Sequence, residues 1–129
     1  MRQRDVDGSL YEQVGGEPFF ERLVDAFYVG VQADELLRAM YPEDLADSKR
    51  HLVIFLVQYW GGPKLYMEER GHPRLRMRHV PFRITKKARD AWLAAMSFAL
   101  ASVRDELTDE QFNEMNSYFD MAAHQLRNV

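Results

Sequence analysis

Residues 74–82 (RLRMRHVPF) carry the side chains with the clearest chemical potential in this chain. One imidazole, that of His79, follows three arginines that alternate with apolar residues. Imidazole is a common metal ligand, and guanidinium groups pair well with carboxylates. The stretch could therefore hold a metal together with the anionic groups of the metal's carrier.

An ordinary structural role is the alternative for His79. Pro73 is expected to open a short helix and Pro81 to end it, because the residue before a proline is disfavoured in the α conformation. A histidine near a helix C-terminus is favoured there, since its positive charge complements the helix dipole. Taken alone, His79 fits this role better than metal binding, so the choice depends on whether the chain supplies a pocket.

Three polar aromatic residues from separate elements are candidates for lining such a pocket: Tyr28, Tyr41 and Trp92. Tyr28 and Trp92 lie on otherwise apolar helical faces, so their polar groups need partners. Most buried groups of this kind find a backbone carbonyl. Three donors that meet in one place could instead stabilise a ligand atom with partial negative charge.

Composition argues against several classes of function. The net charge of -3 gives no broad basic field for nucleic acid, and no apolar run reaches the roughly 20 residues of a membrane span. Cysteine is absent, which leaves histidines, carboxylates or a prosthetic group to hold a metal and agrees with a cytoplasmic location. By themselves, His51, His72 and His124 indicate only surface, rim, turn or core positions.

The elements that must position these residues are expected to be helices. They form one domain over residues 9–129, which follows a flexible tail over residues 1–8. Apolar residues recur at helical spacing over 18–31, 44–60, 85–103 and 109–126, with shorter helices after Ser9 and over 34–40. Leu52, Phe55 and Tyr59 should face inward from the 44–60 helix. Residues 61–72 show no periodicity and predict a loop. Because no strand alternation or hairpin signal occurs, the predicted fold class is all-α.

Local signals predict where several of these helices begin. Ser9 with Glu12, and Thr108 with Gln111, have the spacing of a capping box, in which each side chain bonds the other residue's backbone N–H. Thr85 is placed to cap the long helix that follows it.

A family resemblance appears once these residues are read together. The segments GG (15–16), YPED (41–44), QYWGGP (58–63), GHPRLRMRH (71–79), PFRI (81–84), RDAW (89–92) and MAAH (121–124) closely resemble the truncated haemoglobins of the second group. They occur in the family's order and spacing, over nearly everything from Ser9 onward. The resemblance implies a two-over-two helical sandwich that holds one haem b, with His79 as the proximal iron ligand.

The same resemblance assigns further site residues. Tyr28, Tyr41 and Trp92 match the family's distal polar positions, and Ser48 and Leu52 match distal positions one helical turn apart. The segment between Tyr41 and Leu52 is one residue shorter than in close relatives. The remaining residues implied to contact the haem or its propionates are His51, Phe55, Tyr66, Met77, Arg78 and Phe82.

The function implied is tight binding of dioxygen and other diatomic ligands, because three donors suit holding a ligand better than releasing it. Such a pocket could support redox chemistry, such as nitric oxide dioxygenation or peroxidase-like turnover, with an unidentified reductase. The alternative is a non-enzymatic protein that binds, scavenges, stores or senses oxygen or sulfide. A helical interaction domain without a cofactor is the third reading, and homo-oligomers are also allowed.

Overall fold

The computed structural model describes residues 8–79 and 82–129, and within these ranges it contains helices and no strand. The all-α prediction is confirmed. Most of the predicted tail and the predicted helix stop at Pro81 lie outside the described residues. The elements are α1 (Leu10–Gln13), α2 (Glu17–Ala33), α3 (Glu35–Arg38), α4 (Ala46–Tyr59), α5 (Leu65–Arg70), α6 (Leu75–His79), α7 (Lys86–Ser102), the 3-10 turn η1 (Arg104–Glu106) and α8 (Asp109–Leu126).

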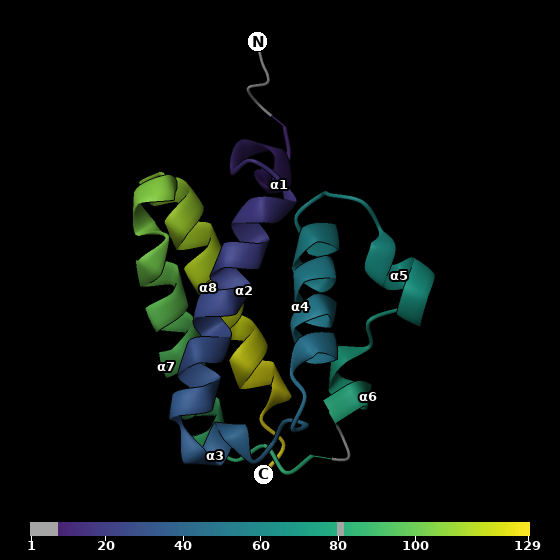
Figure 1. The fold of residues 1–129 in the computed structure, drawn as a ribbon, viewed down its shortest axis with the longest axis vertical. Coiled ribbons are helices and arrows are strands. Elements are labelled where there is room, and N and C mark those ends of the chain that lie inside the picture. Colours follow the sequence, from purple (N-terminus) through teal and green to yellow (C-terminus); the bar gives the residue numbers. More distant parts are fainter. Residues whose placement is uncertain (1–7, 80–81) are drawn as a thin grey trace.

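Four long helices form two antiparallel pairs, α2 with α4 and α7 with α8 (Figure 1). Contacts between α2 and α7 join the pairs into the expected two-over-two sandwich. The helices α2 and α7 approach closely where Gly30 faces Ala95. A Cβ at Gly30 would lie only 2.9 Å from the Cβ of Ala95. The short helix α5 packs against α4 on the side away from α7, and α6 contacts α8 (Figure 1).

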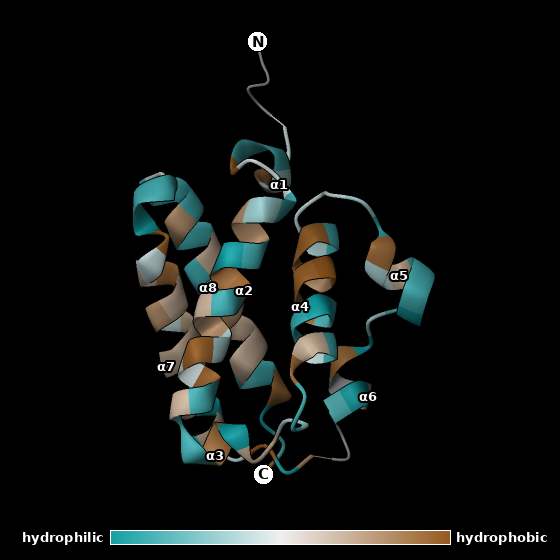
Figure 2. Cartoon of the chain, viewed as in Figure 1, coloured by the Kyte–Doolittle hydropathy of each residue, from teal (hydrophilic) through white to brown (hydrophobic). Residues whose placement is uncertain are grey.

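The core follows the helical spacing of apolar residues. On α2, where helical spacing was predicted over 18–31, the recurring residues are buried: Phe19, Phe20, Leu23, Val24, Phe27, Tyr28 and Val31. Brown and teal residues mix along each long helix in Figure 2, as amphipathic helices require. Both capping boxes form as predicted, and the Thr85 hydroxyl accepts the Ala88 N–H.

Three local expectations are wrong. Residues 61–72 contain the helix α5, which begins after the Gly-Gly-Pro turn and buries Tyr66 to 5% exposure. Pro73 lies outside α6, which begins only at Leu75 after Arg74 adopts φ 43°. Tyr59 is 49% exposed and packs at a tilt against Tyr118 instead of facing inward. The contact with Tyr118 on α8 is what the local pattern could not predict for Tyr59, whereas α5 is too short to give a clear periodic signal.

Gly61 holds the N-terminal helix against the end of α4. Its φ is +99°, and a Cβ there would lie 2.4 Å from the Ser9 Cβ. Nearby, the Tyr11 N–H donates to the Trp60 carbonyl. A larger residue at this position must therefore both strain the backbone and push the two segments apart.

We expect Gly61→Ala to lower the free energy of unfolding by roughly 2–4 kcal/mol, from left-handed strain plus the clash. Gly15→Ala is the matched control, because Gly15 has a similar φ of +97° but nothing within 4 Å of an added Cβ. Urea denaturation of both variants measures the difference. Equal losses in the two variants would show that the clash with Ser9 contributes nothing.

Candidate functional site

A cavity of about 430 Å³ lies between the helical pairs and the α5–α6 segment. Eleven of the twelve residues assigned to the site from the sequence line it: Tyr28, Tyr41, Ser48, His51, Leu52, Phe55, Tyr66, Arg78, His79, Phe82 and Trp92. Met77 does not. It is 64% exposed, because at about 3.6 residues per turn it lies on the opposite side of α6 from Leu75 and His79.

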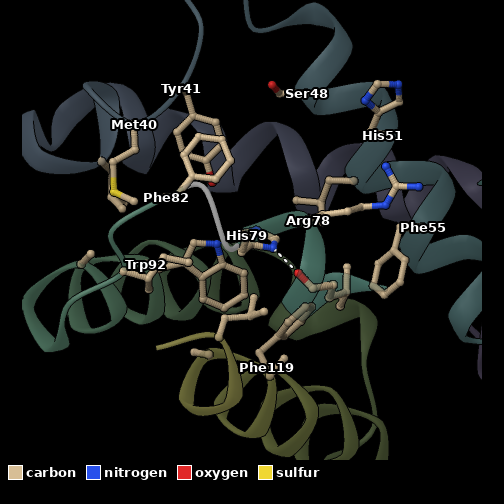
Figure 3. Close-up of a pocket in the computed structure, with 18 of the residues that line it drawn as sticks. Met40, Tyr41, Ser48, His51, Phe55, Arg78, His79, Phe82, Trp92 and Phe119 are labelled. Carbon is tan, nitrogen blue, oxygen red and sulfur yellow. Dashed lines mark hydrogen bonds between the residues drawn. The ribbon is translucent and has the colours of Figure 1, made fainter. Parts of the chain in front are cut away.

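His79 lies at the end of α6 with its imidazole in the cavity wall (Figure 3). Its Nδ1–H donates to the Leu75 carbonyl over 2.7 Å. This bond fixes the orientation of the ring and the tautomer in which Nε2 keeps its lone pair. A half-buried imidazole with one nitrogen engaged and the other available is the arrangement that a metal ligand needs.

In another part of the cavity wall, polar side-chain groups lie around the hydroxyl of Tyr41. The rings of Tyr28 and Tyr41 pack edge to face, with centroids 5.5 Å apart. The Tyr28 hydroxyl and the Trp92 indole N–H lie close enough to the Tyr41 hydroxyl to lower the pKa of Tyr41, and the Ser48 hydroxyl acts in the same way on Tyr28. The three donors predicted from the sequence are therefore brought together, with Ser48 as a fourth member of the cluster.

A basic edge borders the other side of the cavity. An Arg70 Nη1 lies 3.2 Å from both ring nitrogens of His51. The guanidinium groups of Arg70 and Arg78 lie 5.9 and 5.7 Å from the ring centre of Tyr66. Burial, and then the positive charge of Arg70, lower the pKa of His51. This edge suits carboxylate groups.

Comparison with known proteins matches this chain to the bacterial-like globin family over residues 9–125. It is 48% identical to the group 2 truncated haemoglobin YjbI of Bacillus subtilis, over 72% of this chain and 70% of that protein. It is 35% identical to the group 2 truncated haemoglobin 3-1 of Lotus japonicus, over 95% and 77%. The chain belongs to the group 2 truncated haemoglobins.

Solved structures agree with this assignment. A thermostable haemoglobin from Thermobifida fusca superimposes with a TM-score of 0.91 at 47% identity, covering 95% of this chain and 98% of that one. The group II truncated haemoglobin of Bacillus anthracis gives 0.89 at 38% identity, covering 95% and 92%. Proteins of the globin family bind haem and, through it, diatomic ligands such as oxygen. Within the described residues, no helix is long and apolar enough to cross a membrane.

The residues present fit a haem. One imidazole faces an otherwise largely apolar cavity, hydrogen-bond donors gather at a second point of its wall, and cationic side chains border its edge. A planar group with a metal at its centre and carboxylates at one edge needs these three features in this arrangement.

Arg78, which the resemblance implies as a propionate partner, lines the cavity and also holds the loop that leads into α6. Its Nε donates to the Pro73 carbonyl over 2.7 Å, and one Nη donates to the carbonyls of Arg70 and His72 over 2.6 and 3.3 Å. Most of its donors therefore fasten the loop between α5 and α6. Among the described residues, the hydrogen bonds recorded for the Arg70 side chain go only to His51. Arg70 therefore has more unused N–H groups than Arg78.

Several residues that line the cavity of this truncated haemoglobin were not predicted from the sequence. Arg70 and Arg89 gave no signal apart from their charge, and Tyr118 was not predicted to reach the cavity. The spacing of Tyr118 to Ala122 on one helix, with Phe119 between them, could have indicated a shared wall. The others are Leu37, Met40, Pro42, Leu56, Leu75, Ile84, Ala88, Phe119, Ala122, Ala123 and Leu126.

Burial keeps the cavity tyrosines protonated. It raises the pKa of Tyr41 to about 12, although hydrogen bonds from Trp92 and Tyr28 act in the opposite direction. Burial also raises the pKa of Tyr118 to about 12, and that of Tyr28 further still. Tyr28 and Tyr41 therefore remain hydrogen-bond donors at any physiological pH.

These shifts predict the alkaline limit of stability. The folded pKa of Tyr41 lies above its ordinary value of 10, so the folded state holds this proton more tightly and the stabilisation is complete below pH 10. Between pH 10 and 12 we expect the free energy of unfolding to fall by up to ~3 kcal/mol on account of Tyr41. Urea denaturation at each pH measures the fall, and Tyr41→Phe should reduce it. An equal fall in that variant would contradict the assignment.

Proposed function

We propose that this protein holds haem b through His79 and binds dioxygen tightly beneath the Tyr28, Tyr41 and Trp92 cluster. The observation that carries the proposal is the imidazole of His79, oriented by the 2.7 Å bond to Leu75 and facing a cavity that also contains three clustered donors. When bound, haem supplies an iron that takes a diatomic ligand and can change its oxidation state.

Each part of the chain has a separate task in this proposal. His79 supplies one nitrogen to the metal and is held in place by its other nitrogen. Arg70, His51 and Tyr66 are placed to pair with the carboxylates at the edge. Leu52, Phe55 and Phe82 contribute apolar wall, which excludes water and so strengthens hydrogen bonds inside the cavity.

The donors favour retention of the ligand. All three side chains line the cavity, with Trp92 and Tyr28 next to the Tyr41 hydroxyl. In this proposal both donate to the Tyr41 oxygen, which leaves the Tyr41 hydrogen for the ligand. One hydrogen bond to a charged acceptor contributes ~1.5–3 kcal/mol. Acting only on dissociation, ~1.4 kcal/mol slows ligand loss tenfold.

Tight retention supports a redox role ahead of oxygen delivery. Under this proposal the protein uses its bound ligand in chemistry such as nitric oxide dioxygenation or peroxidase-like turnover, and needs a reductase. Slow oxygen release together with a rapid, reductase-sustained reaction with nitric oxide is the expected result. Stopped-flow mixing of the oxygenated protein with nitric oxide measures it, and fast oxygen release from the intact protein would contradict it.

A non-enzymatic role in binding, scavenging or sensing oxygen or sulfide is the second candidate. The same donor cluster supports it, because retention alone is useful to a store or a scavenger. Absence of any sustained turnover with reductant, nitric oxide or peroxide would favour this role. A cytoplasmic location remains a prediction, as does the haem type.

The first test is the absorption spectrum of the protein expressed with haem supplied, reduced with and without carbon monoxide. We expect a Soret band that shifts when carbon monoxide is added. A protein that folds but shows no Soret band would instead be a helical interaction domain.

A further inference from the structure

The end of the chain closes on the segment that follows His79. The side-chain oxygen of Asn128 accepts the Ile84 N–H over 2.9 Å. Its amide nitrogen donates to the Phe82 carbonyl over 2.9 Å, and lies 3.5 Å from the His79 carbonyl. The Asn128 N–H donates to the Ile84 carbonyl over 3.0 Å. One residue thus ties together three residues that are 44 to 49 positions earlier in the chain.

The segment that Asn128 holds has little stability of its own. The helix α6, which ends at His79, has five residues, and a helix this short depends on contacts outside itself. At its beginning, the Arg78 side chain donates to the Pro73 carbonyl. At its end, the His79 carbonyl accepts the Phe82 N–H over 2.9 Å and faces the Asn128 amide.

Asn128 does not serve as a cap for its own helix. It lies two residues beyond Leu126, where α8 ends, after Arg127 has turned to an extended conformation. All the hydrogen bonds that the described part of the chain records for it reach residues 79–84, and none reaches α8. Its side chain is therefore committed to the segment around His79.

We propose that Asn128 is a positioning residue that sets the height and tilt of the His79 imidazole in the cavity. The His79 side chain is attached to the α6 backbone, and its Nδ1–H also donates to the Leu75 carbonyl of the same helix. A shift of that backbone therefore moves Nε2 directly. The inference rests on the proposed role of His79 as iron ligand. Without the amide, His79 and Phe82 lose their side-chain bonds to the C-terminal segment, and only the backbone bond to Ile84 remains. The ring of His79 would then be less firmly positioned.

Two substitutions separate the bonds that Asn128 makes. Asn128→Ala removes every side-chain bond. Asn128→Asp keeps an acceptor for the Ile84 N–H but removes the donor to Phe82 and His79, and it places a carboxylate against their carbonyls. Arg127→Ala is the matched control, because the Arg127 guanidinium contacts only the Val129 carbonyl among the described residues. The backbone bond to Ile84 is retained in all three.

The measurement is the iron–histidine stretching band in the resonance Raman spectrum of the reduced, haem-loaded protein, together with the rate of haem transfer to apomyoglobin. We expect the wild type and Arg127→Ala to share one narrow band. In Asn128→Ala and Asn128→Asp the band should shift or broaden, with haem loss about tenfold faster, the factor that corresponds to ~1.4 kcal/mol.

The outcomes distinguish this inference from the proposed function. An unchanged band in both Asn128 variants, even with a lowered Tm, would overturn the positioning role and leave Asn128 as a structural residue only. Absence of an iron–histidine band in the wild type would instead refute His79 as the ligand. If Asn128→Ala does not fold, Asn128→Asp decides alone, since it retains the bond to Ile84.

Discussion

Replacing His79 with glycine is expected to abolish the histidine-type spectrum of the reduced protein, and added imidazole should restore it. Among the described residues, two histidines line the cavity. His51 lies beside Arg70 at the basic edge, and the substitution removes the other one, His79. Glycine leaves space that free imidazole can fill. Loss of a metal–ligand bond is not compensated by neighbouring side chains, so we expect complete loss of the signal rather than a partial change.

His124→Gly provides a closely matched control. The His124 Nδ1 bonds the carbonyl of Asp120, four residues earlier, over 2.7 Å, as His79 bonds Leu75. His124 lies on an exposed face of α8 and does not line the cavity. The two variants therefore lose the same local bond, but only one loses a group that faces the cavity. If the His79 variant kept the five-coordinate histidine spectrum, the ligand assignment would be wrong.

The contrast between these histidines also shows the limit of sequence reasoning. Helical spacing and capping signals predicted α2, α4, α7 and α8 and, apart from Tyr59, the residues expected on their buried faces, because those signals are local. His79 and His124 have the same local bond to a carbonyl four residues earlier, and only the packing of α6 against α8 places one of them in the cavity wall. The family resemblance, rather than periodicity, singled out His79.

Other parts of the site depended on long-range contacts in the same way. Met77 was expected at the cofactor, but a five-residue helix has one turn facing the cavity, and His79 and Leu75 occupy it. The helix α5 was missed because six residues give too short a periodic signal. Asn128 carries no local signal at all, since its partners lie 44 or more residues away.

Tyr41→Phe is expected to accelerate oxygen dissociation at least tenfold, and Trp92→Phe to have a comparable but smaller effect. The Tyr41 hydroxyl lies beside the Trp92 indole N–H and the Tyr28 hydroxyl, and in our proposal these two donors orient the Tyr41 hydrogen toward the ligand. Loss of this donor removes ~1.5–3 kcal/mol of ligand stabilisation, which is a factor of roughly 10 to 150 in rate. In this proposal Trp92 acts partly through Tyr41, so its removal leaves the two tyrosine donors in place.

Coupling between the two residues follows from the same geometry. Because Trp92 orients Tyr41, the double variant should dissociate oxygen more slowly than the product of the two single effects predicts, and a double-mutant cycle measures this. Tyr118→Phe is the control, since it removes a buried cavity hydroxyl that makes no recorded bond to the cluster. Strictly additive effects would mean that each group reaches the ligand independently. An unchanged rate of oxygen dissociation in Trp92→Phe would remove that residue from the donor set. If Tyr118→Phe accelerated dissociation as much as Tyr41→Phe does, retention would depend on the polarity of the cavity in general.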